Sequence, residues 1–281
     1  MNRGQDPLVS VIIPHQGNDD RLLLCISALR LQTLPAREVE IIIVLNERKE
    51  RTLGFDLKEN ETCIWEPNYY SYNARNRGIQ AAHGSIVALT DSDTVPSLHW
   101  LEHAARHVES GAQLIAGQVT LSYQTRPLSA AASYEKLYAF DQEKNVRFGR
   151  STTANLVGRS ELFTNFTFNV TAETGEDFRW TTAATARGTK LIYAEDVEVS
   201  HPARESLRDL LDKAKRVSRK ATGSLSGGMK TVPAFRHYLS VHLFPPSRSK
   251  RKECSPRELL LATATSLLLQ AAKLWFFLRS R

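Results

Sequence analysis

The chain has 281 residues, of which 37 are Lys or Arg and 30 are Asp or Glu, so its formal net charge is +7. Its hydrophobic content of 42% is enough to build a large core, which excludes a collagen-like or wholly disordered chain. Three cysteines are too few for a disulfide scaffold, and their spacing fits no metal site. The positive charge favours an anionic partner, and composition alone leaves nucleic acid, a phosphorylated small molecule and an anionic membrane open.

The first part of the chain alternates between short apolar runs and helical patterns. A run rich in β-branched residues predicts a buried strand over 8–13, ended by Pro14. A helix over 21–31 and a second strand over 39–45 follow, so the chain opens β-α-β, with parallel strands and a right-handed crossover. We then expect a helix over 72–82, a buried strand over 85–90, and a helix that Ser97 caps and that ends near Glu109.

The alternation of predicted strands and helices continues to about residue 224 and predicts an α/β domain over 1–224. It is followed by a loop-rich basic linker over 225–256 and a C-terminal apolar helix over 257–281. Within the domain we expect strands over 114–121, 155–157, 190–193 and 197–200, and helices over 130–144, 177–187 and 206–221.

The apolar C-terminal run, 259–278, is long enough to cross a bilayer core of roughly 30 Å. Gln270 and Lys273 interrupt it, and basic residues stand before and after it. This pattern favours a helix that lies in or dips into an anionic membrane surface. A true span, and a helix packed on protein, remain alternatives. Because the N-terminal residues do not resemble a signal peptide, we expect a cytoplasmic protein, peripheral or anchored at the inner face of the cell membrane.

Asp91 and Asp93 follow the strand over 85–90 directly. In an open α/β sheet, ligands bind outside the carboxyl ends of the strands. Two carboxylates about 4 Å apart at an effective dielectric constant of about 20 repel by about 4 kcal/mol, so the pair needs a cation or a raised pKa. Hard oxygen ligands suit Mg²⁺ or Mn²⁺. The alternative is an Asx turn or a helix cap.

Glu176 and Asp177 form a second acidic pair, at the start of a predicted helix. The exposed N–H groups of a helix N-terminus stabilise acidic residues without any further function. The functional alternative is a general base aimed at a hydroxyl group. Downstream, His201 follows an apolar strand, and a basic helix comes next, whose charges suit a diphosphate or anionic lipid.

The motifs of the chain, in the order in which they occur along it, resemble those of the inverting glycosyltransferase family 2, which has the GT-A fold. The resemblance covers residues 7–224. It is carried by the opening strand Val9–Pro14, the ARN-type segment Asn73–Ile79, the DxD segment Thr90–Pro96, the segment Thr153–Leu156 on the acceptor side, and the ED motif Gly175–Asp177. The implied fold is a mixed, mostly parallel sheet flanked by helices.

The resemblance also implies roles for individual residues. Asp177 is the expected catalytic base, and Glu176 positions it or the acceptor. Mg²⁺ or Mn²⁺ is expected to be held by Asp93, Asp91 and His201. The nucleotide-sugar is expected to contact Pro14, His15, Asn46, Arg75, Asp91 and Ser92.

The function so implied is metal-dependent, inverting transfer of a sugar from a nucleotide-sugar donor to a lipid-linked or glycan acceptor, in cell-surface polysaccharide synthesis. Two departures from the family pattern bear on it. Leu45 and Asn46 stand where many members carry an Asp that reads the base, so a UDP-sugar donor is in doubt. The Q-x-x-R-W pattern of processive synthases is absent after His201, which favours addition of a single sugar.

Three other functions are alternatives to glycosyl transfer. A catalytically silent relative that binds a nucleotide-sugar or glycan is the main alternative, supported by Leu45. Nucleotidyl transfer is disfavoured, because the segment after the first strand lacks a Gly-rich phosphate loop. Nucleic acid is not expected as a partner, since no aromatic residues interleave with the basic ones.

Overall fold

We analysed a computed structural model of the chain, which describes residues 6–168, 175–223 and 246–279. The chain divides into two compact units. The first, here called the sheet unit, comprises Met1–Thr120, Asn145–Val170 and Glu176–His201. The second, here called the helical unit, comprises Leu121–Lys144, Thr171–Gly175 and Pro202–Arg281.

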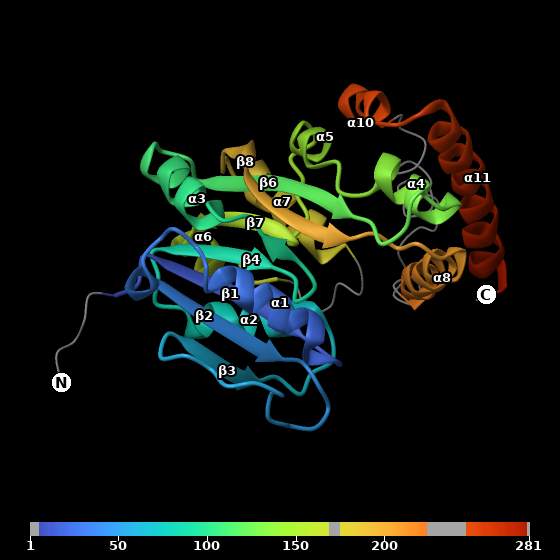
Figure 1. Cartoon of the computed structure of the whole chain (residues 1–281). Coiled ribbons are helices and arrows are strands. Elements are labelled where there is room, and N and C mark those ends of the chain that lie inside the picture. Colours follow the sequence, from blue (N-terminus) through green and yellow to red (C-terminus); the bar gives the residue numbers. More distant parts are fainter. Residues whose placement is uncertain (1–5, 169–174, 224–245, 280–281) are drawn as a thin grey trace. The chain divides into compact units, whose positions relative to one another are not determined.

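Within the described residues, eight strands form one sheet in the order β3-β2-β1-β4-β7-β6-β8-β5 (Figure 1). The strands β1 to β4 are parallel to one another, and β7 runs antiparallel to both β4 and β6. Their bounds are β1 Val9–His15, β2 Val39–Leu45, β3 Glu61–Trp65, β4 Ile86–Thr90, β5 Val95–Pro96, β6 Leu114–Ser122, β7 Asn155–Arg159 and β8 Leu191–Pro202. The predicted β-α-β opening with parallel strands is confirmed.

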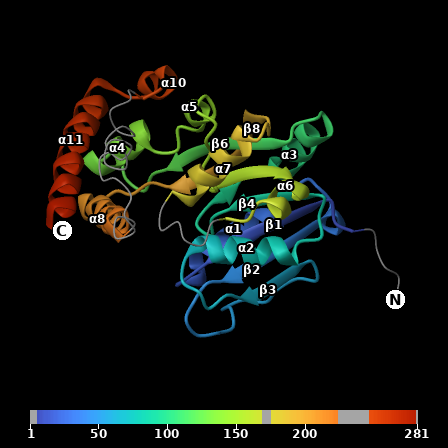
Figure 2. The same ribbon diagram turned by 180° about the vertical axis from the view of Figure 1, so that it is seen from behind.

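Helices cover both faces of this sheet, as the two opposite views in Figures 1 and 2 show. On one face lie α1 (Asp19–Leu29) and α3 (Trp100–Glu109), and on the other lie α2 (Ser71–Ala81), α6 (Ser160–Asn165) and α7 (Glu176–Ala186). The core between the sheet and the helices on this second face includes Ile12, Leu89, Leu156, Phe168 and Trp180, all of which are buried. The β-branched and leucine-rich strands thus supply apolar side chains to both faces, as buried parallel strands require.

Several elements differ from the sequence predictions. β1 continues through Pro14 to His15. It pairs with β4 only over Val9–Ile12, so Pro14, which has no N–H, lies beyond that ladder. The helix expected over 130–144 is two helices, α4 (Ala130–Tyr138) and α5 (Gln142–Val146), because Phe140 has a φ of 49° between them.

Three further differences concern strands and a cap. The two short strands expected over 190–200 are one continuous strand, β8. β3 was not predicted, because its five residues show no clear alternation. Ser97 does not cap α3: the helix begins at Trp100, and its cap residue makes no side-chain bond to the first turn.

Four helices of the described part of the chain lie wholly within the helical unit: α4, α8 (Leu207–Gly223), α10 (Arg248–Lys252) and α11 (Pro256–Arg279). α11 packs against α4 and α8. The predicted C-terminal apolar helix is therefore present, and over Pro256–Phe276 it is long and apolar enough to cross a membrane, by length and composition alone. Of the predicted linker, residues 225–245 lie outside the described residues and Arg248–Lys252 form α10.

Candidate active site

The acidic turn after β4 is held in place by threonine hydroxyl groups beneath it. Thr94 donates a hydrogen bond from Oγ1 to the backbone oxygen of Asp91 at 2.8 Å, and Thr90 donates one to the backbone oxygen of Ala154 at 2.9 Å. Both threonines are fully buried, and their hydroxyl oxygens lie 2.7 Å apart. The turn that presents Asp91 and Asp93 is therefore anchored to the sheet rather than free in solvent.

His201, the last residue of the sheet unit in the sequence, lies close to this turn. β5, which follows the turn, pairs antiparallel with β8, so that Val95 lies opposite Ser200. This pairing places Nε2 of the buried His201 3.5 Å from Oδ1 of Asp93. Ligand atoms of Asp91, Asp93 and His201 all lie within 4.8 Å of one another. Two carboxylates and an imidazole at this spacing fit a divalent cation such as Mn²⁺ or Mg²⁺.

Arg75, on α2, connects the two acidic pairs. Its Nη2 lies 2.9 Å from Oδ1 of Asp91, and its Nη1 lies 3.4 Å from Oε1 of Glu176. The side chain is buried, and Ser71 also donates a hydrogen bond to Glu176 at 3.2 Å. The expected contact of Arg75 with the base or a phosphate stays a prediction, but the structure commits its guanidinium group to these two carboxylates.

Asp177 lies in the first turn of α7, partly buried, beside Glu176. The pKa of its carboxyl is raised to about 7, first by desolvation and then by the negative charge of Glu176, while a backbone hydrogen bond from Phe178 and the charge of Arg75 partly oppose the shift. A carboxylate with a pKa near neutrality is suited to accept a proton from a hydroxyl group. The two acidic pairs thus stand in different environments within one site, linked by Arg75.

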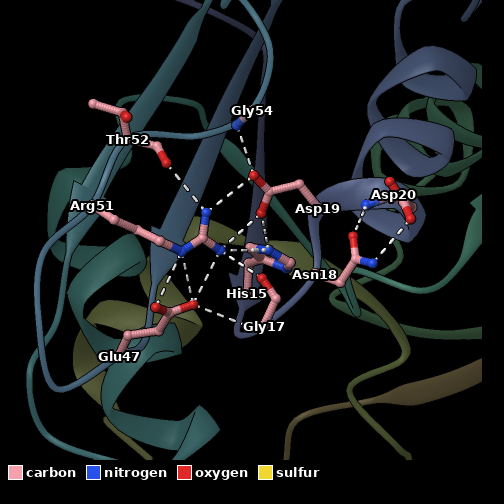
Figure 3. A network of polar contacts seen from close by, with 9 residues as sticks. All are labelled: His15, Gly17, Asn18, Asp19, Asp20, Glu47, Arg51, Thr52 and Gly54. Carbon is pink, nitrogen blue, oxygen red and sulfur yellow. Dashed lines mark hydrogen bonds and ion pairs between the residues drawn. The ribbon is translucent and has the colours of Figure 1, made fainter.

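A second polar network lies at the carboxyl ends of β1 and β2 (Figure 3). Nε2 of His15 lies 2.9 Å from Oδ1 of Asp19, and Asp19 also accepts hydrogen bonds from Arg51 at 2.8 and 3.0 Å. Arg51 in turn pairs with Glu47 at 3.1 Å and holds the pKa of the Asp19 carboxyl well below its usual range. His15 is buried, and its Nδ1 has no hydrogen-bond partner.

Sequence reasoning found only His15 in this network and missed Asp19, Glu47 and Arg51. The i, i+4 spacing of Glu47 and Arg51 was visible, but it indicates a pair only inside a helix, and these residues lie in a loop. Beside the network is an open cavity of about 470 Å³. It is lined by Gln16, Gly17, Glu47, Arg48, Lys49 and Tyr69.

Three other predicted site residues are also in this region. Asn46 is buried, and its side chain bonds only to backbone in the loop that follows β3: it donates to the oxygens of Glu66 and Asn68 and accepts from the N–H of Tyr70. Pro14 is half-buried in β1, and Ser92 is half-buried between the two aspartates. Asn46 therefore shapes the loop near the cavity, and the contacts of all three with a nucleotide stay predictions.

Comparison with known proteins agrees with this geometry. The chain matches the family described as "Glycosyl transferase family 2" over residues 10–163, more than half of its length. It is 29% identical to "Glycosyltransferase AglE" of Haloferax volcanii over 300 aligned residues, which cover 98% of this chain and 97% of that protein.

Two solved structures share the fold at low sequence identity. One is the mannosyltransferase PcManGT from Pyrobaculum calidifontis in complex with GDP-Man and Mn²⁺, with a TM-score of 0.55, 17% identity, and coverage of 98% of this chain and 86% of that one. The other is S. aureus TarS 1-349 in complex with UDP-GlcNAc, with a TM-score of 0.55, 13% identity, and coverage of 96% and 89%. Their mixed sheet with flanking helices is the sheet observed here, so the expected GT-A fold is confirmed. The chain therefore belongs to glycosyl transferase family 2 and is a glycosyltransferase of the GT-A fold.

Proposed function

We propose that this enzyme is a metal-dependent, inverting glycosyltransferase that moves one sugar from a nucleotide-sugar donor to a lipid-linked or glycan acceptor. One observation carries the proposal: Arg75 pairs with both Asp91 and Glu176, which brings the two acidic pairs into a single site. A metal-binding carboxylate pair and a proton-accepting carboxylate are then within reach of the same substrate.

The donor end of the site is formed by Asp91, Asp93 and His201. These three side chains would hold a divalent cation, which would supply positive charge to stabilise the departing nucleoside diphosphate. The buried Thr94 anchors the backbone of this turn at Asp91, which supports a defined position for the leaving group. Mn²⁺ accompanies GDP-Man in the Pyrobaculum structure, which supports Mn²⁺ or Mg²⁺ here.

The nucleotide is proposed to bind at the carboxyl ends of β1 and β2. The open cavity there offers the aromatic ring of Tyr69 for stacking and the cations Arg48 and Lys49 for phosphate. His15 lies in the network beside this cavity, and Nδ1 of its ring is buried without a partner. The named ligands of two relatives, GDP-Man and UDP-GlcNAc, support a nucleotide-sugar as the donor class.

Asp177 is proposed as the base. With a pKa of about 7, its carboxylate removes the proton from the acceptor hydroxyl as the oxygen attacks the anomeric carbon. The attack comes from the face opposite the leaving diphosphate, so a single displacement inverts the anomeric configuration. Glu176, held by Arg75 and Ser71, stays fixed beside the base and positions it.

The acceptor and the membrane are proposed from the composition of the C-terminal part. α11 is apolar over a length that could cross a bilayer, and α10 before it is cationic. These features support a lipid-linked or cell-surface glycan acceptor reached at an anionic membrane surface, on its cytoplasmic side. A binding module without activity is the weaker alternative, because binding alone gives no use to the carboxyl of Asp177, whose pKa is raised.

The test uses the purified full chain with a panel of nucleotide-sugars, scored by nucleotide release with Mn²⁺, Mg²⁺ or a chelator. We expect release with one donor class, its loss on chelation, and recovery when metal is returned. Asp93→Ala should abolish metal-dependent donor binding in calorimetry, while Asp56→Ala, at an exposed loop position, should not.

The stereochemistry is checked by NMR of the first product formed from an α-linked donor. A β-linked product supports inversion. Metal-independent release, or full activity in Asp93→Ala, would contradict the assignment of the metal site.

A further inference from the structure

The C-terminal helix α11 has a pattern of buried and exposed side chains opposite to that of an ordinary surface helix. The residues it buries are small or polar: Glu258, Ala262, Thr265, Ser266 and Leu269, with a single leucine among them. The residues it exposes are large and apolar, with exposed fractions between 42% and 72%. We call this stripe the leucine face; it consists of Leu260, Leu267, Leu268, Leu274 and Trp275.

The spacing shows that the leucine face is continuous. Its residues recur seven or eight positions apart along the chain, which is two turns of an α-helix. They therefore lie on one side of α11, and the five buried residues lie on the opposite side. A soluble helix normally has the reverse arrangement, with its large apolar side chains toward the protein.

The buried side of α11 is committed to the helical unit by specific contacts. Glu258 pairs with Lys136 of α4 at 3.0 Å, and Thr265 donates a hydrogen bond to the backbone oxygen of Ala130 at 3.3 Å. Leu269 packs in a buried cluster with Tyr134 of α4 and Leu210 of α8. Among the described residues of α11, the leucine face is the side whose large apolar side chains stay exposed.

Cations stand at both ends of this helix. α10, which precedes α11 closely, exposes Arg248, Arg251 and Lys252, and Arg279 is the last residue of α11. Figure 1 shows α10 at the N-terminal end of α11. A helix that crossed the bilayer would carry these two groups to opposite surfaces. A helix that lies flat brings both groups of cations to the lipid phosphates of one surface, where each basic residue contributes about 1 kcal/mol to the binding free energy.

We propose that the leucine face binds the boundary between head groups and acyl chains of an anionic bilayer, with α11 parallel to the membrane and α10 on the head groups. The bilayer is favoured over a second protein because α11 combines an exposed apolar stripe with cations at both of its ends, and tryptophan is a residue type enriched at that boundary. This inference rests on the proposed membrane surface and adds to it the face and the orientation of the contact.

The test measures sedimentation of the full chain with vesicles of phosphatidylcholine alone and of phosphatidylcholine mixed with phosphatidylglycerol. Leu267→Glu/Leu268→Glu should lower the partition coefficient at least about tenfold, because burying each leucine is worth about 1.5–3 kcal/mol. The matched control, Leu24→Glu/Leu31→Glu, changes two equally exposed leucines of the sheet unit and should bind as the wild type does. Circular dichroism checks that both double variants fold.

A second pair of variants tests the charges. Arg251→Glu/Lys252→Glu should weaken binding to the anionic vesicles about tenfold or more and remove most of its salt dependence, with little effect on neutral vesicles. Equal binding of wild type to both vesicle types would overturn the electrostatic part of the proposal.

Three results would overturn the proposal as a whole. Wild-type binding that persists in Leu267→Glu/Leu268→Glu shows that the face is not the contact. Resistance of the wild type to extraction by alkaline carbonate shows a spanning helix. A dimer in light scattering that Leu267→Glu/Leu268→Glu dissociates, without loss of vesicle binding, assigns the face to a second copy. Donor binding is measured on the same samples by calorimetry, so a failure of the catalytic proposal is seen separately.

Discussion

At the scale of single residues, Arg75 connects the two acidic pairs. Its guanidinium group contacts Asp91 on one side and Glu176 on the other, and the side chain is buried. Hydrogen bonds to charged groups are worth about 1.5–3 kcal/mol, and the planar guanidinium has enough donors for both partners. Arg75 is therefore the residue that fixes the two acidic pairs relative to each other.

The proposed role of Asp177 as the base predicts how transfer depends on pH. Below pH about 7 its carboxyl is protonated and cannot accept the acceptor's proton, so we expect kcat to rise with pH with a midpoint near 7. Asp177→Asn should lower kcat by about 10²–10⁴-fold and abolish this rise, with donor affinity unchanged in calorimetry. Asp56→Asn, at an exposed loop position, is the control. Full transfer activity in Asp177→Asn would contradict the assignment of the base.

The same shift has a consequence for stability. Because the pKa of Asp177 is higher in the folded state than its ordinary value of 3.8, the folded protein binds the proton more tightly than the unfolded chain. The stability it contributes is complete below pH about 3.8 and is lost as the pH rises through about 7. An asparagine stays neutral, so Asp177→Asn should gain thermal stability relative to wild type above that pH.

At the scale of elements, the sheet unit depends on a close contact between β6, β7 and β8. Asn155 of β7 donates hydrogen bonds from Nδ2 to the backbone oxygens of Gln118 and Val197 at 2.8 Å, and its Oδ1 accepts one from Trp100 at 2.9 Å. Gly117 lies directly against this side chain, and a Cβ there would collide with Nδ2 of Asn155 and the backbone oxygen of Val197. β8 is thereby held beside β6, and β8 carries His201.

Gly117→Ala should therefore lower the free energy of unfolding by about 1–3 kcal/mol, the usual cost of forcing extra atoms into a packed interior. Denaturant unfolding monitored by fluorescence measures the change. Gly54→Ala is the control, since its Cβ would meet only the carboxylate of Asp19, at 3.3 Å. Equal stability of Gly117→Ala and wild type would show that the three strands are not tightly coupled here.

At the scale of the whole molecule, α11 is part of a folded unit and not a detachable anchor. It covers Ala131 and Tyr134 of α4 and Leu210 of α8, and Ala262 packs with Leu137. A chain that ends after Pro246 lacks α10 and α11, so it should melt at a lower temperature than the full chain and bind a hydrophobic dye. Unchanged melting without dye binding would show that α4 and α8 do not need α11. Point variants of the leucine face are for this reason the sharper test of membrane contact.

The sequence alone was informative where a signal is local. The β-α-β opening, the strand before Asp91, and the apolar C-terminal helix follow from periodicity and composition within each segment, and the structure confirms each of them. The motif order was sufficient for the family and the fold, because each motif is short and contiguous. The predicted helix over 130–144 was wrong at Phe140, since composition does not report a single residue with positive φ.

The tertiary structure decided everything that depends on contact between distant segments. His201 reaches Asp93 only because β8 pairs with β5, and Arg75 meets Glu176 across about a hundred residues of chain. Asp19 and Arg51 form their network through loops that have no periodicity. The large residues of α11 were visible in the sequence, but which side of the helix they occupy relative to α4 was not. Local order follows from short-range sterics and hydrophobic spacing, whereas these contacts follow from the topology that brings separate elements together.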